Sequence, residues 1–143
     1  MEKSRMNLHY EIPSDDLAHA GEASSSVKKM LVQLGIDPVR IKKAAVSMYE
    51  AEINAVIHGG GGSAEVTIDS DKIVIRIIDN GPGIADLELA MQEGYTTASD
   101  DIREMGFGAG MGLPNMKRYA DELDIQTRPD KGTIVTIVVY FHQ

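Results

Sequence analysis

The sequence has no cysteine among its 143 residues. This absence excludes a disulfide framework, a thiolate zinc site and a cysteine nucleophile. The chain also lacks an apolar run long enough to span a membrane, and its N-terminal stretch MEKSRMNLHYEI has no apolar core of a signal peptide. We therefore expect a soluble, cytoplasmic protein that does not associate with membranes.

The sequence has fewer basic than acidic residues. Lys and Arg total 14 against 22 Asp and Glu, which gives a formal net charge of -8. Nonspecific binding to nucleic acid or anionic lipid needs a basic face that displaces counterions, so neither partner is expected. Any phosphate that the protein handles must be held locally, by backbone amides, a metal ion or a few basic side chains. The length suits a single domain over residues 1–143 with its own core.

Alternating apolar residues predict strands. The first, MNLHYEI, has the period of a strand with one buried face, and two runs rich in β-branched residues are separated only by Ser70 and Asp71, which predicts a hairpin. A second hairpin is expected around the turn RPDKG near the C-terminus. Strands are therefore expected at 6–12, 64–69, 72–79, 123–127 and 133–141.

Helical spacing predicts three main helices. The first follows Ser14 and ends at Gly35, with Leu17, Ala20, Val27, Leu31 and Leu34 as its apolar residues. The second runs from Val39 to His58 behind an Asp37 N-cap, and the third starts near Pro114 with Leu113, Met116, Ala120 and Leu123 on its apolar face. Residues 84–91 suggest one or two further turns, and 93–111 a loop. Together these elements predict an α+β two-layer sandwich with a mixed, mostly antiparallel sheet.

The second helix contains EAEIN, in which Glu50 and Asn54 are four residues apart and share one helical face. Their side chains project beside an apolar row, so the carboxylate needs a partner. A magnesium-bound phosphate would supply one: Asn54 offers a carbonyl oxygen to Mg²⁺, and Glu50 can accept a proton from an attacking hydroxyl. Glu52 points about 200° away from Asn54 and cannot converge with it. The alternative is a solvated helix edge, and His58 is interpreted as a capping or packing residue.

The stretch DNGPG at 79–83 is a strong turn signal, and a hairpin corner is the simplest interpretation. The residues that follow have helical rather than alternating spacing, however, which places Asp79 at the edge of a pocket. An ionised carboxylate there can accept a hydrogen bond from an exocyclic amine such as that of adenine. Gly81 and Gly83 would let the base approach the main chain closely.

Glycine occupies every second position of GFGAGMGL at 106–113. Alternating glycines permit successive amides to point into one anion-binding concavity, and the helix that starts near Leu113 adds its positive end. The segment fits neither a dinucleotide-binding G-x-G-x-x-G nor a Walker A loop, because the required final glycine or lysine is missing. A flexible linker is the alternative. The candidate phosphate-binding residues are Gly106, Gly108, Gly110, Met111, Gly112 and Leu113.

Taken together, E-x-x-x-N, D-x-G-x-G, the glycine loop and a late Gly-Thr pair resemble the GHKL ATPase superfamily with its Bergerat nucleotide-binding fold. Within it the chain is most similar to the small bacterial anti-sigma-factor serine/threonine kinases, over nearly its whole length. The resemblance implies that Asn54 coordinates Mg²⁺, that Glu50 is the general base and that Asp79 reads adenine. It further implies a lid containing Thr97, phosphate-facing amides at Gly108, Gly110 and Gly112, and a hydrogen bond from Thr133 near the adenine.

These implications favour an ATP- and Mg²⁺-dependent kinase that phosphorylates a STAS-domain antagonist and so regulates transcription or stress signalling by partner switching. The alternative is a nucleotide-gated binding module that sequesters a sigma factor or activates a phosphatase without phosphoryl transfer. A third interpretation, the catalytic half of a histidine kinase, ranks lower because no preceding dimerisation helix bears a phosphorylatable histidine. Apolar residues of the first strand and helix offer a face for a homodimer.

Overall fold

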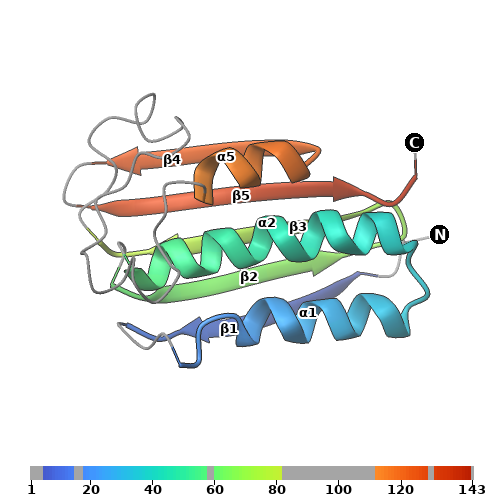
Figure 1. Cartoon of the computed structure of the whole chain (residues 1–143), viewed down its shortest axis with the longest axis horizontal. Coiled ribbons are helices and arrows are strands. Elements are labelled where there is room, and N and C mark those ends of the chain that lie inside the picture. Colours follow the sequence, from blue (N-terminus) through green and yellow to red (C-terminus); the bar gives the residue numbers. More distant parts are fainter. Residues whose placement is uncertain (1–4, 15–17, 58–59, 82–111, 129–130, 143) are drawn as a thin grey trace.

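The computed structural model describes residues 5–14, 18–57, 60–81, 112–128 and 131–142. These residues form two layers, a five-stranded sheet with the described helices side by side on one face (Figure 1). The expected α+β sandwich is therefore confirmed. In chain order the elements are β1 (Met6–Ile12), α1 (Glu22–Gln33), α2 (Pro38–Ile57), β2 (Gly62–Ile68), β3 (Lys72–Asp79), α5 (Gly112–Tyr119), β4 (Glu122–Arg128) and β5 (Gly132–Tyr140).

The sheet has the strand order β1-β2-β3-β5-β4, and every pairing among the described strands is antiparallel. All five strands lie where the sequence predicts them, within two residues at each end. The hairpin between β2 and β3 is confirmed: the Asp69 amide donates to the Lys72 carbonyl at 3.0 Å, and the Asp71 amide donates to Asp69 Oδ1 at 2.7 Å. Because β5 pairs with both β3 and β4, this C-terminal strand lies inside the sheet and not at its edge.

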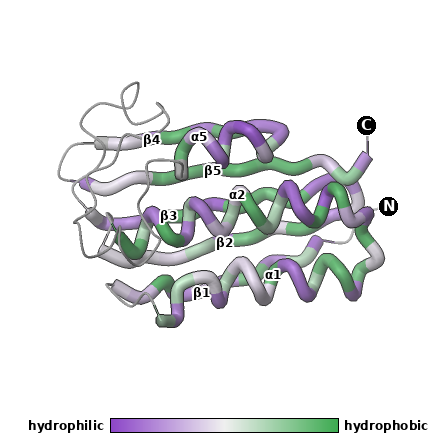
Figure 2. Tube along the Cα trace, in the orientation of Figure 1, coloured by the Kyte–Doolittle hydropathy of each residue, from purple (hydrophilic) through white to green (hydrophobic). Residues whose placement is uncertain are grey.

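The core lies between the sheet and the helices. Alternate residues of the central strands face the helices and are buried, and β5 is hydrophobic along most of its length (Figure 2). The helices meet this face with apolar side chains that have no solvent exposure, among them Val27, Leu31, Met48 and Met116. None of the described helices is long and apolar enough to cross a membrane.

Helix α2 begins as predicted. The Asp37 side chain accepts a hydrogen bond from the Val39 amide at 3.1 Å, and Pro38 occupies the first helical position. Helix α1, in contrast, begins at Glu22 rather than just after Ser14. Its N-cap is Gly21, which has a φ of 97° and makes no side-chain capping bond.

The C-terminal end of α1 is partly as predicted. Gly35 has a φ of 74°, and its amide donates to the Val32 carbonyl, so it ends the helix in the left-handed conformation. Leu34 is 46% exposed, however, and does not belong to the apolar face.

Helix α5 is shorter than predicted. It ends at Tyr119, and Leu123 pairs with Ile137 in the sheet instead of extending the helix. The reason is Asp121, whose backbone amide donates to the Val138 carbonyl at 2.9 Å. This contact turns the chain from helix to strand. The predicted helical stretch at 84–91 and the loop at 93–111 lie outside the described residues.

Candidate functional site

Four chain segments meet at one end of the fold, on the left in Figure 1: the end of α2, the start of β2, the end of β3 and the start of β5. The connection from α2 into β2 is tight, since the Gly61 amide donates to the Ala55 carbonyl at 3.0 Å. In the sheet, Gly62 pairs with Asp79, and Asp79 pairs with Thr133. Residues far apart in sequence are thereby brought to one edge.

Asp79 is the last residue of β3 and is only 8% exposed. Its Oδ1 accepts hydrogen bonds from the Gly81 amide at 3.0 Å and from the Thr133 amide at 3.2 Å. Burial raises the pKa of this carboxyl above its ordinary value, although both N–H donors favour the ionised form and oppose the rise. The two bonds use one oxygen and fix the orientation of the carboxylate.

Two glycines let the backbone pack tightly around Asp79. A Cβ atom on Gly62 would lie 1.9 Å from the Ile78 carbonyl oxygen, and one on Gly132 would lie 2.2 Å from the Asp79 carbonyl oxygen. Neither position has room for a side chain. This is a physical reason for glycine at the last position of the GGGG run at 59–62.

Thr133 follows Gly132 on β5 and is 4% exposed. Its hydroxyl lies 3.1 Å from the hydroxyl of Thr127 on β4, and its amide reaches Asp79. The predicted neighbours Asp79, Gly81 and Thr133 are thus brought together in one hydrogen-bonded group.

Glu50 and Asn54 lie one turn apart on α2, and both are half-buried. The Nδ2 of Asn115, on α5, is 3.4 Å from Glu50 Oε1 and donates to it. Burial raises the pKa of Glu50, and the bond from Asn115 partly opposes this. Sequence reasoning missed Asn115, although its place three residues after Gly112, in the first turn of a helix, was a usable signal.

A groove of about 620 Å³ runs between α1 and α2. Glu50 is one of the residues that line this groove. Its lining is more apolar than polar and consists of Ala20, Gly21, Glu22, Ser24, Ser25, Lys28, Ala45, Val46, Tyr49 and Glu50.

Glu52 was predicted to point away from Asn54 and was given no role. It is only 1% exposed, and its carboxylate accepts the amides of Gly21 at 2.9 Å, Ala23 at 3.2 Å and Ser24 at 3.0 Å. Glu52 therefore caps α1 from the neighbouring helix. This explains why α1 starts without a cap of its own.

The glycine loop is only partly described. Gly112 is the first residue of α5, and Leu113 is 6% exposed with its side chain in the hydrophobic core, so only its backbone is available to a ligand. Gly83, Thr97, Gly106, Gly108, Gly110, Met111 and His58 lie outside the described residues. Within the described ranges, no group of three or more His, Asp or Glu side chains is placed to hold a metal ion.

The model of one protein family matches residues 43–143; its description is histidine kinase-, DNA gyrase B-, and HSP90-like ATPase. The anti-sigma F factor of Thermoanaerobacter sp. (strain X514) is 39% identical over 110 residues, which cover 73% of this chain and 72% of that relative. The anti-sigma F factor of Clostridium beijerinckii is 33% identical over 150 residues, covering 99% of this chain and 98% of the relative.

The fold agrees with these matches. The crystal structure of the RsbU and RsbW domains of Rv1364c from Mycobacterium tuberculosis matches 94% of this chain and 32% of its own, with a TM-score of 0.63 at 18% identity. The expected GHKL fold is thus confirmed by sequence and by structure. The chain belongs to the histidine kinase-, DNA gyrase B- and HSP90-like ATPases, and within them to the relatives of the anti-sigma F factors.

Proposed function

We propose that this chain, acting as one domain, is a protein serine/threonine kinase that transfers the γ-phosphoryl group of ATP to a partner protein. The family is one of ATPases, which supports ATP as the donor. The observation that carries the proposal is the position of Glu50: a half-buried carboxylate on the wall of an open groove, one helical turn from Asn54.

The group around Asp79 fits a purine. Oδ1 is held by two backbone amides, and among the described residues nothing is shown to bind Oδ2, which we propose accepts a hydrogen bond from the exocyclic amine of adenine. Thr133 lies next to this carboxylate through its amide, and its hydroxyl, 3.1 Å from that of Thr127, is proposed to reach the adenine. Gly81 and Gly83 follow Asp79 in the DNGPG segment, and we propose that they let the base approach the main chain closely.

Asn54 fits a magnesium ion held mainly by nucleotide phosphates and water, because such an ion takes only one or two oxygen ligands from the protein. In this role the ion would neutralise charge on the phosphates. The amides from Gly106 to Leu113 are proposed to bind the phosphates at the start of α5, with Thr97 in the covering segment.

Glu50 is proposed as the general base. Its carboxylate takes the proton of the partner's serine or threonine hydroxyl as the hydroxyl oxygen bonds to the γ-phosphorus. The bond from that phosphorus to the β,γ-bridging oxygen breaks, and ADP leaves with the electron pair. The groove between α1 and α2 supports this role because Glu50 is among its lining residues and the groove offers space for a segment of the partner.

The test uses ATP labelled at the γ-phosphate and proteins retained by this chain in the presence of ATP and Mg²⁺. We expect label on a serine or threonine of a STAS-domain protein, mapped by mass spectrometry. Glu50→Ala is expected to reduce the transfer rate at least 100-fold, as loss of a general base does, with ATP still bound. A Glu50→Ala variant that labels the partner at the normal rate would overturn the assignment.

Nucleotide-dependent capture of a sigma factor is a second candidate, favoured by the anti-sigma F factor names of the relatives. The same experiment separates the two functions. A protein that only binds retains its partner with ATP and leaves it unlabelled, whereas a kinase transfers the label.

A further inference from the structure

Asn115 links the helix after the glycine loop to the helix that carries Glu50. It lies in the first turn of α5, three residues after Gly112, and its amide donates to Glu50 Oε1 at 3.4 Å. Both side chains are half-buried. Among the described residues no Lys or Arg forms an ion pair with Glu50, so the Asn115 amide is the donor that meets this carboxylate.

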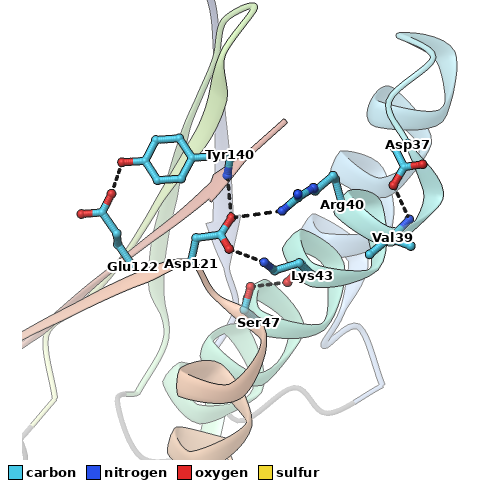
Figure 3. Close-up of polar contacts among 8 residues, drawn as sticks. All are labelled: Asp37, Val39, Arg40, Lys43, Ser47, Asp121, Glu122 and Tyr140. Atoms are coloured by element: carbon cyan, nitrogen blue, oxygen red, sulfur yellow. Dashed lines mark hydrogen bonds and ion pairs between the residues drawn. The ribbon is translucent and has the colours of Figure 1, made fainter. Parts of the chain in front are cut away.

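The backbone under Asn115 is held firmly against α2. Met116, the next residue, has no solvent exposure, and Lys42 of α2 lies 5.8 Å from the centre of the Tyr119 ring at the other end of α5. Just beyond the helix, Asp121 binds Lys43 of α2 (Figure 3). The Asn115 amide is thus carried on a helix that cannot easily move away from Glu50.

We propose that Asn115 is a positioning residue that fixes the Glu50 carboxylate by holding Oε1, which leaves Oε2 to take the proton of the acceptor hydroxyl. This inference rests on the proposed kinase function. A carboxylate at the end of a flexible side chain loses rotational freedom when one oxygen is bound, so the fraction of time it spends in the productive orientation rises. Asn115 acts on the acceptor side of the reaction and not on ATP.

The same contact also affects the pKa of Glu50, in the direction opposite to burial. An N–H that donates to a carboxylate favours the charged form, so removing the Asn115 amide raises the pKa of Glu50 further in the direction that burial already drives it. Among the described residues, Tyr49 on α2 interacts electrostatically with Glu50, and Glu22 and Lys28 of α1 line the same groove. Glu52 is turned toward the first turn of α1 and is not part of this contact.

The first measurement needs neither nucleotide nor partner. Carbon-13 NMR titration of the Glu50 side-chain carboxyl in the full chain is compared among the wild type, Asn115→Ala and Asn115→Asp. We expect the pKa to rise in the Ala variant and to rise more in the Asp variant, which places a second carboxylate against the first. The control is Asn7→Ala on β1, which removes an amide bound to Thr67 and leaves Glu50 unchanged.

The second measurement is steady-state phosphorylation of the protein acceptor mapped by the γ-labelling experiment above. We expect Asn115→Ala to lower kcat about 10-fold, the equivalent of one hydrogen bond. Its KM for ATP should stay unchanged, and the acid limb of its pH profile should shift to higher pH. Circular dichroism verifies that each variant is folded.

Three results would overturn the proposal: an unchanged Glu50 pKa in both variants, a raised pKa with an unchanged kcat, or a raised KM for ATP with normal kcat. The last would make Asn115 a nucleotide ligand. If the wild type itself transfers no label, the kinase function fails, and the positioning role fails with it even where the titration still shows the contact.

Discussion

Two glutamates on one helix show how local environment decides what a residue does. Glu50 and Glu52 are separated by a single alanine and face opposite sides of α2. Glu52 is buried and receives three backbone amides, whereas Glu50 is half-buried and receives one side-chain amide at 3.4 Å. The Glu52 carboxylate is fully engaged in the fold, whereas the Glu50 carboxylate remains available for chemistry.

The raised pKa of Glu50 predicts a stability cost at neutral pH. Because its folded-state pKa lies above the ordinary value of 4.5, ionisation is penalised in the folded protein more than in the unfolded chain. The penalty is complete above the folded pKa and disappears as pH falls to 4.5. We therefore expect Glu50→Gln to raise the free energy of unfolding at pH 7 to 8, with the gain vanishing toward pH 4.5.

Urea denaturation at several pH values checks this expectation. Glu22→Gln, also in the groove but exposed in the first turn of α1, is the matched control and should not stabilise the protein. If Glu50→Gln instead lowered the free energy of unfolding at pH 7, the ionised Glu50 carboxylate would be stabilising the fold, and the prediction would be contradicted.

At the residue scale, the sequence predicted which residues belong to the candidate site but not how those residues are arranged. The 3.6-residue helical period placed Glu50 and Asn54 on one face, and the DNGPG turn marked Asp79. The contacts that these residues make with Asn115 and Thr133 could not be predicted, because Asn115 is 65 residues from Glu50 and the Thr133 amide is 54 residues from Asp79. Such contacts depend on strand order and helix packing and leave no local pattern.

Helix α1 depends on α2 for its first turn. The four amides at the start of a helix lack internal partners, and here Glu52 satisfies the amides of Gly21, Ala23 and Ser24. A local capping residue is absent, which is why sequence patterns placed the helix start too early. The strands were predicted well because alternation is a property of each strand by itself.

We expect Glu52→Ala to lower the free energy of unfolding by about 3 kcal/mol, since it strands buried donors and opens a cavity. Glu52→Gln, which keeps an acceptor oxygen but loses the charge, should cost about 1 kcal/mol. Chemical denaturation measures both changes, with Glu22→Ala as an exposed control on the same turn. Surface substitutions usually change the free energy of unfolding by less than about 0.5 kcal/mol. A change that small for Glu52→Ala would contradict the capping role.

The corner between α5 and β4 is tied to α2 by Asp121 (Figure 3). Its carboxylate binds Lys43, accepts the Tyr140 amide at 2.8 Å and lies 3.8 Å from Arg40. Burial alone would raise the pKa of Asp121, but Lys43, the Tyr140 amide and Arg40 together lower it. The corner therefore fixes the length of α5 and the approach of that helix to Glu50.

The pKa of Asp121 is lower in the folded protein than its ordinary value of 3.8. Its ionised carboxylate therefore stabilises the fold at pH values above 3.8, and this stabilisation is lost as the pH falls through the folded-state pKa. We expect Asp121→Asn to cost about 1 kcal/mol at pH 7 and less below pH 3.8. Thermal unfolding across this pH range measures the change. An equal cost at pH 7 and pH 3 would mean that the charge contributes nothing.

At the scale of the whole molecule, the strand order brings the site together. Because β5 lies between β3 and β4, Thr133 from the C-terminal strand becomes the neighbour of Asp79, and β2 adds Gly62 on its other side. In the helical layer, α2 carries Glu50 and Asn54, and α5 brings Asn115 to within 3.4 Å of Glu50. Sequence patterns predicted the fold class, and the resemblance to GHKL ATPases linked the separate motifs into one site.

The central claim is that Asp79 marks a purine site at this end of the sheet, and titration calorimetry with ATP and Mg²⁺ tests it most directly. Asp79→Asn keeps the oxygen that accepts the Gly81 and Thr133 amides but presents a donor to the adenine amine, so we expect wild-type binding and at least 10-fold weaker binding by the variant. Asp124→Asn, exposed on β4, is the control of equal charge and should bind like the wild type. Equal affinities of the wild type and Asp79→Asn, or no heat from either, would contradict the account.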